Sequence, residues 1–176
     1  MAAQQRYGLA TRVREPSRLL ADLITNIGFQ QLAIFRCASA LHRRGFTPAA
    51  MVLIRLLRHL YAAELNWATD IAPGIALVHG NGLVISREAR IDPGWVLSQN
   101  VTIGVSRGPL VVSEPLLEAD VHIGPGAVLI GPIVVGPRSK IAANCVVMTD
   151  LAPGTVVTPS PPVVRQREDA DRRAPS

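Results

Sequence analysis

Hydrophobic positions change their spacing once along the chain. From Ile71 onward an Ile, Leu or Val recurs at every sixth position, with a slip of two residues at His79 and one long interruption after Ile103. The positions that follow this rule are Ile71, Leu77, Ile85, Ile91, Leu97, Ile103, Leu117, Ile123, Leu129, Val135, Ile141 and Val147. The residue after each is often small or polar, and many of the turns between them contain Gly or Pro. This pattern is a hexapeptide repeat, which predicts short strands separated by tight turns.

Such a repeat predicts a prism of stacked coils. One aliphatic side chain points inward on each strand, three strands close a triangular coil, and neighbouring coils pair through parallel backbone hydrogen bonds. No single coil can bury its apolar side alone, so the coils must stack around a continuous aliphatic column. The interruption at residues 104–115 is then expected to be a loop that projects from one corner of the prism. Loops on rigid scaffolds commonly carry function.

Before the repeat, apolar residues recur at spacings of three and four, which predicts helices. One helix is expected from Pro16 to Gly45, and a second from Thr47 to about Ala63. The expected division of the chain is an N-terminal helical region at 1–63, a repeat domain at 64–164 and a charged, disordered tail at 165–176.

Composition and charge narrow the class of protein. Apolar residues make up 48% of the 176 residues and aromatic residues only 4%, which predicts an aliphatic core. The net charge is +5, and many arginines precede the repeat. This imbalance would suit a polyanion, an acidic membrane surface or a phosphorylated cofactor, but it is equally typical of a solvated helix face. No aromatic residues interleave the arginines, so a nucleic-acid partner is not expected.

Cysteine usage and hydropathy bear on the compartment. Cys37 and Cys145 are isolated, and no cleavable signal peptide is recognised, which predicts reduced thiols in a cytoplasmic protein. The most hydrophobic early window, 19–41, is interrupted by polar and charged residues, so no membrane span is expected.

His79 is the side chain best suited to proton transfer. It lies at the turn where the six-residue count slips, so its ring is expected to point outward, and Gly80 and Gly82 leave room for a ligand. A neutral imidazole there could take the proton of a hydroxyl, a role worth roughly 10²- to 10⁴-fold in rate. Glu64 lies fifteen residues upstream, close to one full coil, and its carboxylate could orient the ring. Asp70 is a weaker partner, and an exposed turn histidine without a catalytic role is the alternative.

The histidines do not form a pattern of metal ligands. His42 and His59 fall in the helical region, whereas His79 and His122 stand apart in the repeat. His122, just before an inward Ile123, is expected to be a surface or interface residue. Zinc sites need a cluster of three or four ligands, so no metal is predicted.

Two segments of the repeat resemble a known family. QNVTIG at 99–104 is similar to QSVTLGG of the serine acetyltransferases, and GPIVVGPRSKIAANCVVMTDLAPGTVV at 131–157 resembles their closing coils. The resemblance covers residues 64–164 and extends to the relatives that acetylate sugars. It implies a mainly β fold class, a left-handed parallel β-helix preceded by a short α-helical region. It also implies a CoA-dependent O-acetyltransferase with His79 as general base and Glu64 as its partner in a catalytic dyad.

The same resemblance implies where the donor binds. In the family, coenzyme A lies in the groove between neighbouring subunits of a trimer and is held mainly by backbone groups, with cations near its phosphates. The cofactor-binding residues implied for acetyl-CoA are Gly104, Val105, Ser106, Pro125, Lys140, Ala143 and Arg165. The expected assembly is a homotrimer. Docking to cysteine synthase is not expected, because Ser176 stands where the family has a terminal Ile.

The acceptor side departs from the family pattern. Val78 stands where serine acetyltransferases have Asp, and Ser113 and Glu114 replace the Arg and His that end their loop. The acceptor-binding residues implied are Val78, Arg107, Ser113 and Glu114. Because these positions lack the expected cation for a carboxylate, the small hydroxyl-bearing acceptor stays open among serine, another amino acid and a sugar. A sugar or polysaccharide O-acetyltransferase and a non-catalytic hexapeptide scaffold are the alternatives.

Overall fold

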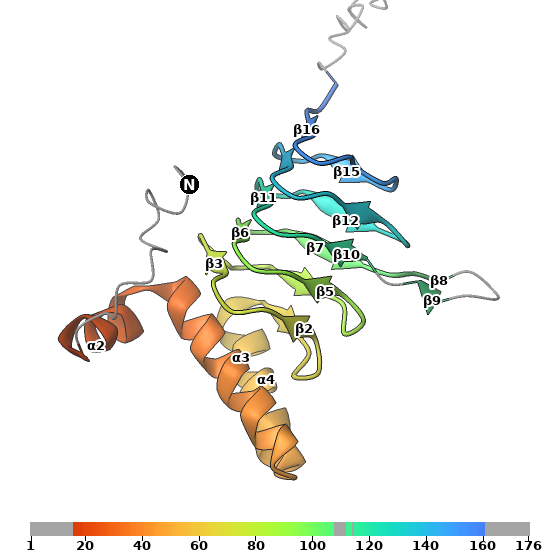
Figure 1. Cartoon of the computed structure of the whole chain (residues 1–176). Coiled ribbons are helices and arrows are strands. Elements are labelled where there is room, and N and C mark those ends of the chain that lie inside the picture. Colours follow the sequence, from red (N-terminus) through yellow and green to blue (C-terminus); the bar gives the residue numbers. More distant parts are fainter. Residues whose placement is uncertain (1–15, 108–111, 114, 161–176) are drawn as a thin grey trace, which may run out of the picture.

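The computed structural model describes residues 16–107, 112–113 and 115–160. Three helices come first in this part of the chain: α2 at Pro16–Thr25, α3 at Ile27–Arg43 and α4 at Thr47–Tyr61. Short strands follow, and they stack upward from the helices (Figure 1). Glu114 and Arg165, which were predicted to bind acceptor and cofactor, and the predicted tail at 165–176 lie outside the described residues.

The strands are two or three residues long and form three parallel sheets, one on each side of the coil. The first sheet has the order β1-β4-β7-β12-β15, the second β13-β10-β5-β2 and the third β16-β14-β11-β6-β3. Their bounds are β1 Glu64–Leu65, β2 Asp70–Ile71, β3 Ala76–Leu77, β4 Val84–Ile85, β5 Arg90–Ile91, β6 Val96–Leu97, β7 Thr102–Gly104, β10 Leu116–Leu117, β11 His122–Ile123, β12 Val128–Ile130, β13 Val134–Val135, β14 Lys140–Ile141, β15 Val146–Val147 and β16 Val156–Val157. Each turn of the chain therefore adds one strand to every sheet.

The core is the aliphatic column that the repeat predicts. All twelve predicted inward positions are buried, and the most exposed of them, Leu77, has only 8% of its surface accessible. A second column fills the corners, two residues before the inward ones. It includes Leu83, Val101 and Ala127, and also Trp95, whose Nε1 donates to the carbonyl of Glu118 at 2.8 Å. The predicted inward set is confirmed, whereas the corner column was not part of the prediction.

The prediction of one helix from Pro16 to Gly45 is wrong, because the chain breaks at Asn26. This residue has φ −107° and ψ 102°, outside the helical region, and its side chain accepts a hydrogen bond from the N–H of Phe29 at 3.0 Å. Asn is a favoured N-cap, since its side-chain oxygen satisfies a free N–H in the first turn. Asn26 therefore ends α2 and starts α3 in a new direction, as Figure 1 shows.

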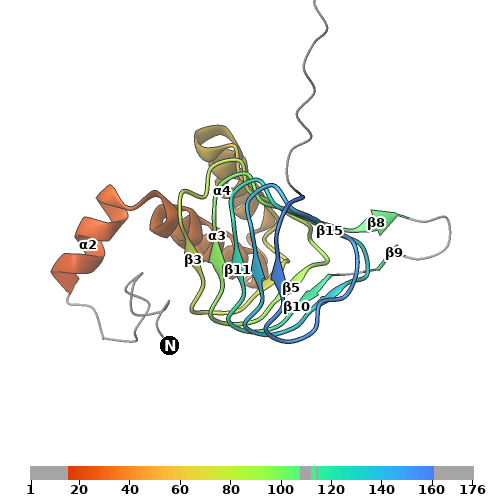
Figure 2. The same cartoon turned by 90° about the horizontal axis from the view of Figure 1, so that it is seen from above.

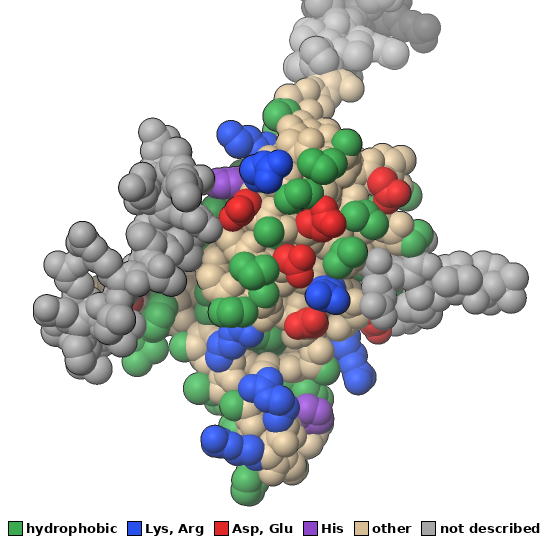
Figure 3. Space-filling model, in the orientation of Figure 1, with side chains coloured by type: hydrophobic (Ala, Val, Ile, Leu, Met, Phe, Trp, Pro, Cys, Tyr) green, Lys and Arg blue, Asp and Glu red, His purple; other side chains and the backbone are tan. Residues whose placement is uncertain are grey.

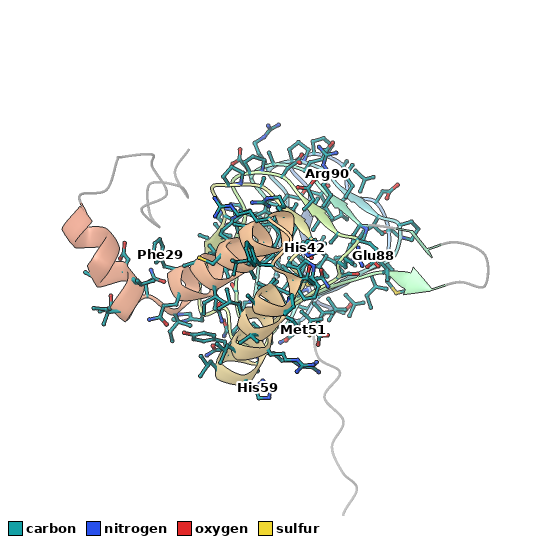
Figure 4. All side chains as sticks on the ribbon, turned by 90° about the horizontal axis from the view of Figure 1, so that it is seen from below. Phe29, His42, Met51, His59, Glu88 and Arg90 are labelled. Carbon is teal, nitrogen blue, oxygen red and sulfur yellow. The ribbon has the colours of Figure 1, made fainter. Side chains whose placement is uncertain are left out.

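Helices α3 and α4 cover the open end of the prism, as seen from below in Figure 4. Phe35 of α3 and Leu57 of α4 are buried in the same hydrophobic cluster as the first coil. The guanidinium of Arg36 donates to the carbonyls of Ile71 at 2.6 Å and Ala72 at 2.7 Å. The helical region is thus bonded to the coil that carries His79.

The interruption of the repeat begins and ends as an antiparallel β-hairpin. Strand β8, Ser106–Arg107, pairs with β9, Val112–Ser113, and the two project away from the stacked coils (Figure 2). The hairpin leaves the prism after β7 and returns to it at β10, at the corner between the first and second sheets.

Charge is unevenly distributed over the surface. On the face seen in Figure 3, several Lys and Arg side chains gather over the helical end, and most Asp and Glu side chains lie over the coils. Among the described residues, none of the helices is long and apolar enough to cross a membrane.

Candidate active site

The turn at His79 contains two residues more than a regular corner. Leu65 pairs with Ile85, twenty residues on, whereas Ile85 pairs with Ile103, eighteen residues on. The backbone ladder holds as far as Val78, whose N–H donates to Leu97 at 2.7 Å, and it resumes where Asn81 accepts from Asn100 at 2.9 Å. The extra residues, His79 and Gly80, therefore form a bulge at the corner between the third and first sheets.

His79 occupies this bulge in an uncommon backbone conformation. Its φ is +56°, in the left-handed region that non-glycine residues seldom adopt. Regular corners place the same conformation on residues suited to it, such as Asn100, Asp120 and Asn144. The side chain of His79 is exposed, and within the described part of the chain its ring makes no hydrogen bond. The imidazole is thus presented to solvent at an edge of the prism.

Glu64 lies one coil below the strand that follows the bulge. Its N–H donates to the carbonyl of Leu83 at 2.7 Å, and it pairs with Val84 in the first sheet. The N–H of Gly82 also donates to Tyr61 at 3.1 Å, which stacks the end of the bulge on the residues that precede Glu64. The fold therefore places Glu64 beside the residues that follow the bulge.

The carboxylate of Glu64 faces a cation from the helical region. Its Oε2 lies 3.8 Å from Nη2 of Arg58, and the two side chains are 58% and 66% exposed. An ion pair this exposed contributes little to stability. No hydrogen bond joins Glu64 to His79 among the described residues.

Two cavities border the predicted site residues. The larger has a volume of about 970 Å³ and lies between α3 and β3, with Val78, His79 and Arg36 in its wall. The smaller, of about 430 Å³, has Glu64, Gly104 and Val105 in its wall. Val78 and His79 thus border one hollow, and Glu64 shares the other with residues predicted to bind the donor.

Three of the predicted donor-binding residues lie at opposite ends of the strands of the first sheet. Pro125 and Ala143 are at the same corner as His79 on later coils, and the carbonyl of Pro125 accepts from Asn144 at 2.9 Å. Gly104 ends β7 at the other end of the sheet, where the hairpin begins. Lys140 lies apart from both, exposed on the third sheet beside His122.

The hairpin carries three more of the predicted residues, Ser106, Arg107 and Ser113. Ser106 pairs with Ser113, and Arg107 pairs with Val112. One residue predicted to bind the donor, Ser106, is therefore held directly opposite one predicted to bind the acceptor, Ser113.

Within the described part of the chain, the pKa values of two groups are shifted. The pKa of the Arg36 guanidinium is lowered by burial and by Arg43, against an opposing effect of Asp70. The pKa of His122 is lowered by burial and then by Lys140, one coil above it, with Asp120 acting in the opposite sense. No group of three or more His, Cys, Asp or Glu that could hold a metal ion occurs within residues 16–107, 112–113 and 115–160.

Sequence reasoning missed one polar residue beside the bulge. Gln31 of α3 is fully buried and packs against Gly80. A glutamine on the apolar side of an amphipathic helix was the available signal, but the sequence does not tell which residue of the repeat it would meet.

Comparisons with known proteins agree with the repeat and the fold. The family model described as bacterial transferase hexapeptide (six repeats) matches residues 114–148. The chain is 34% identical over 133 residues to the serine acetyltransferase of Helicobacter pylori (strain ATCC 700392 / 26695), which covers 76% of this chain and 78% of that protein.

Solved structures extend the likeness to the fold. Isoform 3 of the serine acetyltransferase of Entamoeba histolytica, in complex with cysteine, superposes with a TM-score of 0.73 at 26% identity, covering 85% of this chain and 54% of the other. The serine acetyltransferase of Neisseria gonorrhoeae, in complex with serine, gives a TM-score of 0.74 at 25% identity, covering 91% and 63%. The predicted fold class, a left-handed parallel β-helix after a short helical region, is confirmed. The chain spans less than two thirds of these two solved chains.

Proposed function

Because the chain belongs to the serine acetyltransferase family, we propose that it moves an acetyl group from acetyl-CoA to the side-chain hydroxyl of L-serine. Membership confirms the predicted enzyme class, an acyltransferase. Its relative from Helicobacter pylori is a serine acetyltransferase, which supports L-serine as the acceptor. The observation that carries the mechanism is the two-residue bulge, which presents His79 at an edge of the prism with Glu64 one coil below the strand that follows.

His79 acts as the general base. Its exposed ring takes the proton of the acceptor hydroxyl as the oxygen forms its bond to the acetyl carbonyl carbon. The same ring then returns that proton to the departing sulfur of CoA, so no covalent enzyme intermediate is needed. A carboxylate on the other ring nitrogen fixes the tautomer and stabilises the imidazolium, which is the role proposed for Glu64. This requires the Glu64 side chain to turn from Arg58 toward His79.

The residues bordering the smaller cavity are suited to the donor. Acetyl-CoA supplies the activated acetyl group, and Gly104 leaves space beside it, since a β-carbon there would meet nothing closer than Ile130 Cγ1 at 3.9 Å. A backbone N–H between Gly104 and Ser106 would stabilise the oxyanion that forms during transfer. Pro125, Ala143, Lys140 and Arg165 complete the proposed donor site.

A homotrimer is the proposed assembly. Aliphatic side chains stand on the outer faces of the coils, and Val146 and Val156 are 63% and 64% exposed. Such exposed apolar residues favour association between subunits. The strands of the first sheet have donor residues at both of their ends. A groove between two subunits would bring those at one end, in one subunit, close to those at the other end, in its neighbour. Light scattering on the purified protein measures the mass and so tests the trimer.

A sugar acceptor is the second candidate, and Val78 is the observation that favours it. This half-buried valine places an apolar side chain beside His79 in the larger cavity. A valine cannot pair with the ammonium group of an amino acid, whereas it can pack against a sugar ring. The acceptor-binding roles of Arg107, Ser113 and Glu114 remain part of either proposal.

The enzymatic test follows the release of free thiol from acetyl-CoA with L-serine, other amino acids and a panel of sugars. The expected result is turnover with L-serine, reduced by roughly 10²-fold or more in His79→Ala. His59→Ala, on the exposed side of α4, is the matched control and should keep full activity. Turnover with sugars alone would favour the second candidate. Undiminished turnover in His79→Ala would remove this residue from the mechanism, and absence of CoA binding by calorimetry would favour a non-catalytic scaffold.

The compartment proposed is the cytoplasm. Both cysteines are free, and Cys37 is exposed, which suits a reducing environment.

A further inference from the structure

Gln31 is the exception among the buried polar side chains of the described residues. It is 0% exposed, and neither its Oε1 nor its Nε2 has a hydrogen-bond partner among them. Buried polar atoms are normally paired, because leaving them unpaired forfeits the hydrogen bonds they make to water in the unfolded chain. An unpaired amide in a packed core is therefore unusual.

The amide lies directly against the bulge that carries His79. A β-carbon built on Gly80 would stand 2.0 Å from Oε1 of Gln31 and 3.0 Å from its Cδ. Gly80 is buried, and its backbone N–H donates to no group in the described part of the chain. The unpaired Oε1 of Gln31 thus lies against the Cα of Gly80, on the side where a β-carbon would stand, and the N–H of the same residue is also unpaired.

Several polar groups around this point are paired. Gln30, the neighbouring residue on α3, accepts from the hydroxyl of Tyr61 at 2.7 Å and donates to the carbonyls of Leu23 and Ile24. In the bulge, the carbonyl of His79 accepts from Asn81 at 2.8 Å. The amide of Gln31 and the N–H of Gly80 thus stay unpaired beside groups that are paired.

Helix α3 gives the amide a fixed base. Gly28, one turn before Gln31, touches the backbone of Leu77, and Arg36 is bonded to Ile71 and Ala72. The helix cannot move relative to the first coil without breaking these contacts. The Gln31 side chain is thus held in place, while the bulge beside it lacks the ladder hydrogen bonds of a regular corner.

We propose that Gln31 is a positioning residue: its amide oxygen accepts a hydrogen bond from the N–H of Gly80 in the working enzyme and so fixes the direction in which His79 presents its ring. The link is direct, because that N–H belongs to the peptide joining His79 to Gly80. Holding this peptide fixes ψ of His79, one of the two backbone angles that set how the residue sits in the bulge. The inference rests on the proposed role of His79 as general base.

The first test replaces the amide by a side chain of similar length without polar atoms, Gln31→Met. The expected kcat is about tenfold lower, since small displacements of a catalytic group can cost up to about 10²-fold, while KM for acetyl-CoA stays within about twofold. The melting temperature should be unchanged or higher, because a buried unpaired amide has been removed. The ¹⁵N chemical shifts of the His79 ring, measured without substrates, should move.

A double-mutant cycle tests the contact itself. In Gly80→Ala the new methyl group meets Oε1 of Gln31, so kcat should fall about tenfold. Gln31→Ala combined with Gly80→Ala empties the space that the methyl group needs, so kcat of the double variant should equal that of Gln31→Ala alone instead of falling about a further tenfold. Independent, multiplying effects of the two substitutions would refute the contact.

Gln30→Met is the matched control, because it removes the paired amide next along the same helix. It should lower the melting temperature and leave kcat and the His79 ring shifts unchanged. Wild-type kcat and unmoved His79 shifts in Gln31→Met would overturn the proposal. So would a joint fall of kcat and melting temperature with unmoved shifts, which would mark Gln31 as merely structural. Failure of the proposed function is visible separately, as undiminished turnover in His79→Ala.

Discussion

Gly28 of helix α3 touches the carbonyl oxygen of Leu77 in strand β3 so closely that a β-carbon on residue 28 would stand 2.0 Å from that oxygen. Real β-carbons do not approach an oxygen to this distance. The helix therefore lies backbone against backbone on the strand that leads into His79. The geometry of the bulge depends on how α3 is seated as well as on the repeat.

Gly28→Ala should destabilise the protein by about 2 kcal/mol, the usual cost of overpacking a site that cannot expand. In a helix interior the same change ordinarily stabilises by about 1 kcal/mol, so the sign of the effect identifies the contact. Urea unfolding followed by circular dichroism measures it. Gly104→Ala is the control, because its β-carbon would find only ordinary contacts. Equal stability of Gly28→Ala and the wild type would contradict the close seating.

Arg36→Ala should lower the free energy of unfolding by about 2 kcal/mol, because two charge-assisted hydrogen bonds to Ile71 and Ala72 are lost. Arg36→Lys should recover less than half of this loss. A compact ammonium group cannot reach two carbonyls with the planar geometry of a guanidinium. Thermal and urea unfolding of the three proteins give the comparison, and a lysine variant as stable as the wild type would show that charge alone suffices.

Glu64→Gln should reduce kcat by roughly 10²-fold, since a neutral amide neither fixes the tautomer of His79 nor stabilises its protonated form. KM for acetyl-CoA should change little. Arg58→Ala is the matched control, because it breaks the 3.8 Å ion pair with Glu64 and leaves the carboxylate in place. Its activity should equal or exceed that of the wild type. A loss in Arg58→Ala as large as in Glu64→Gln would assign the ion pair, rather than a dyad, to the function of Glu64.

His122 should make the stability depend on pH. Burial and Lys140 lower its pKa in the folded protein, so the unfolded chain binds the proton more readily. Stability is therefore full above the pKa of the unfolded histidine, about 6.5, and falls as the pH drops below it toward the folded value. Urea unfolding between about pH 8 and pH 5 should show this loss in the wild type and a smaller one in His122→Gln. An identical pH dependence in both proteins would exclude His122 as its source.

Some site geometry follows from spacing alone. The slip of two residues at His79 locates the bulge, because Leu65 pairs with Ile85 twenty residues on, whereas Ile85 pairs with Ile103 eighteen residues on. The fifteen residues from Glu64 to His79 are close to one full coil, so spacing puts Glu64 at the start of the first coil and His79 at its last corner. The direction of the Glu64 carboxylate does not follow from spacing, since it depends on Arg58 of a helix outside the repeat.

The sequence by itself determined the prism, because a hexapeptide repeat applies one local rule at every turn and each coil meets only its neighbours. The twelve inward positions and the corner of His79 could therefore be counted along the chain. Only the tertiary structure decided how the helices close the first coil: where Asn26 breaks them, that Gly28 rests on Leu77, and that Gln31 faces Gly80. Those contacts join the helices, where apolar residues recur every three or four positions, to the repeat, where they recur every six. Their register depends on how side chains pack across the interface, and the spacing of residues along the chain does not determine that packing.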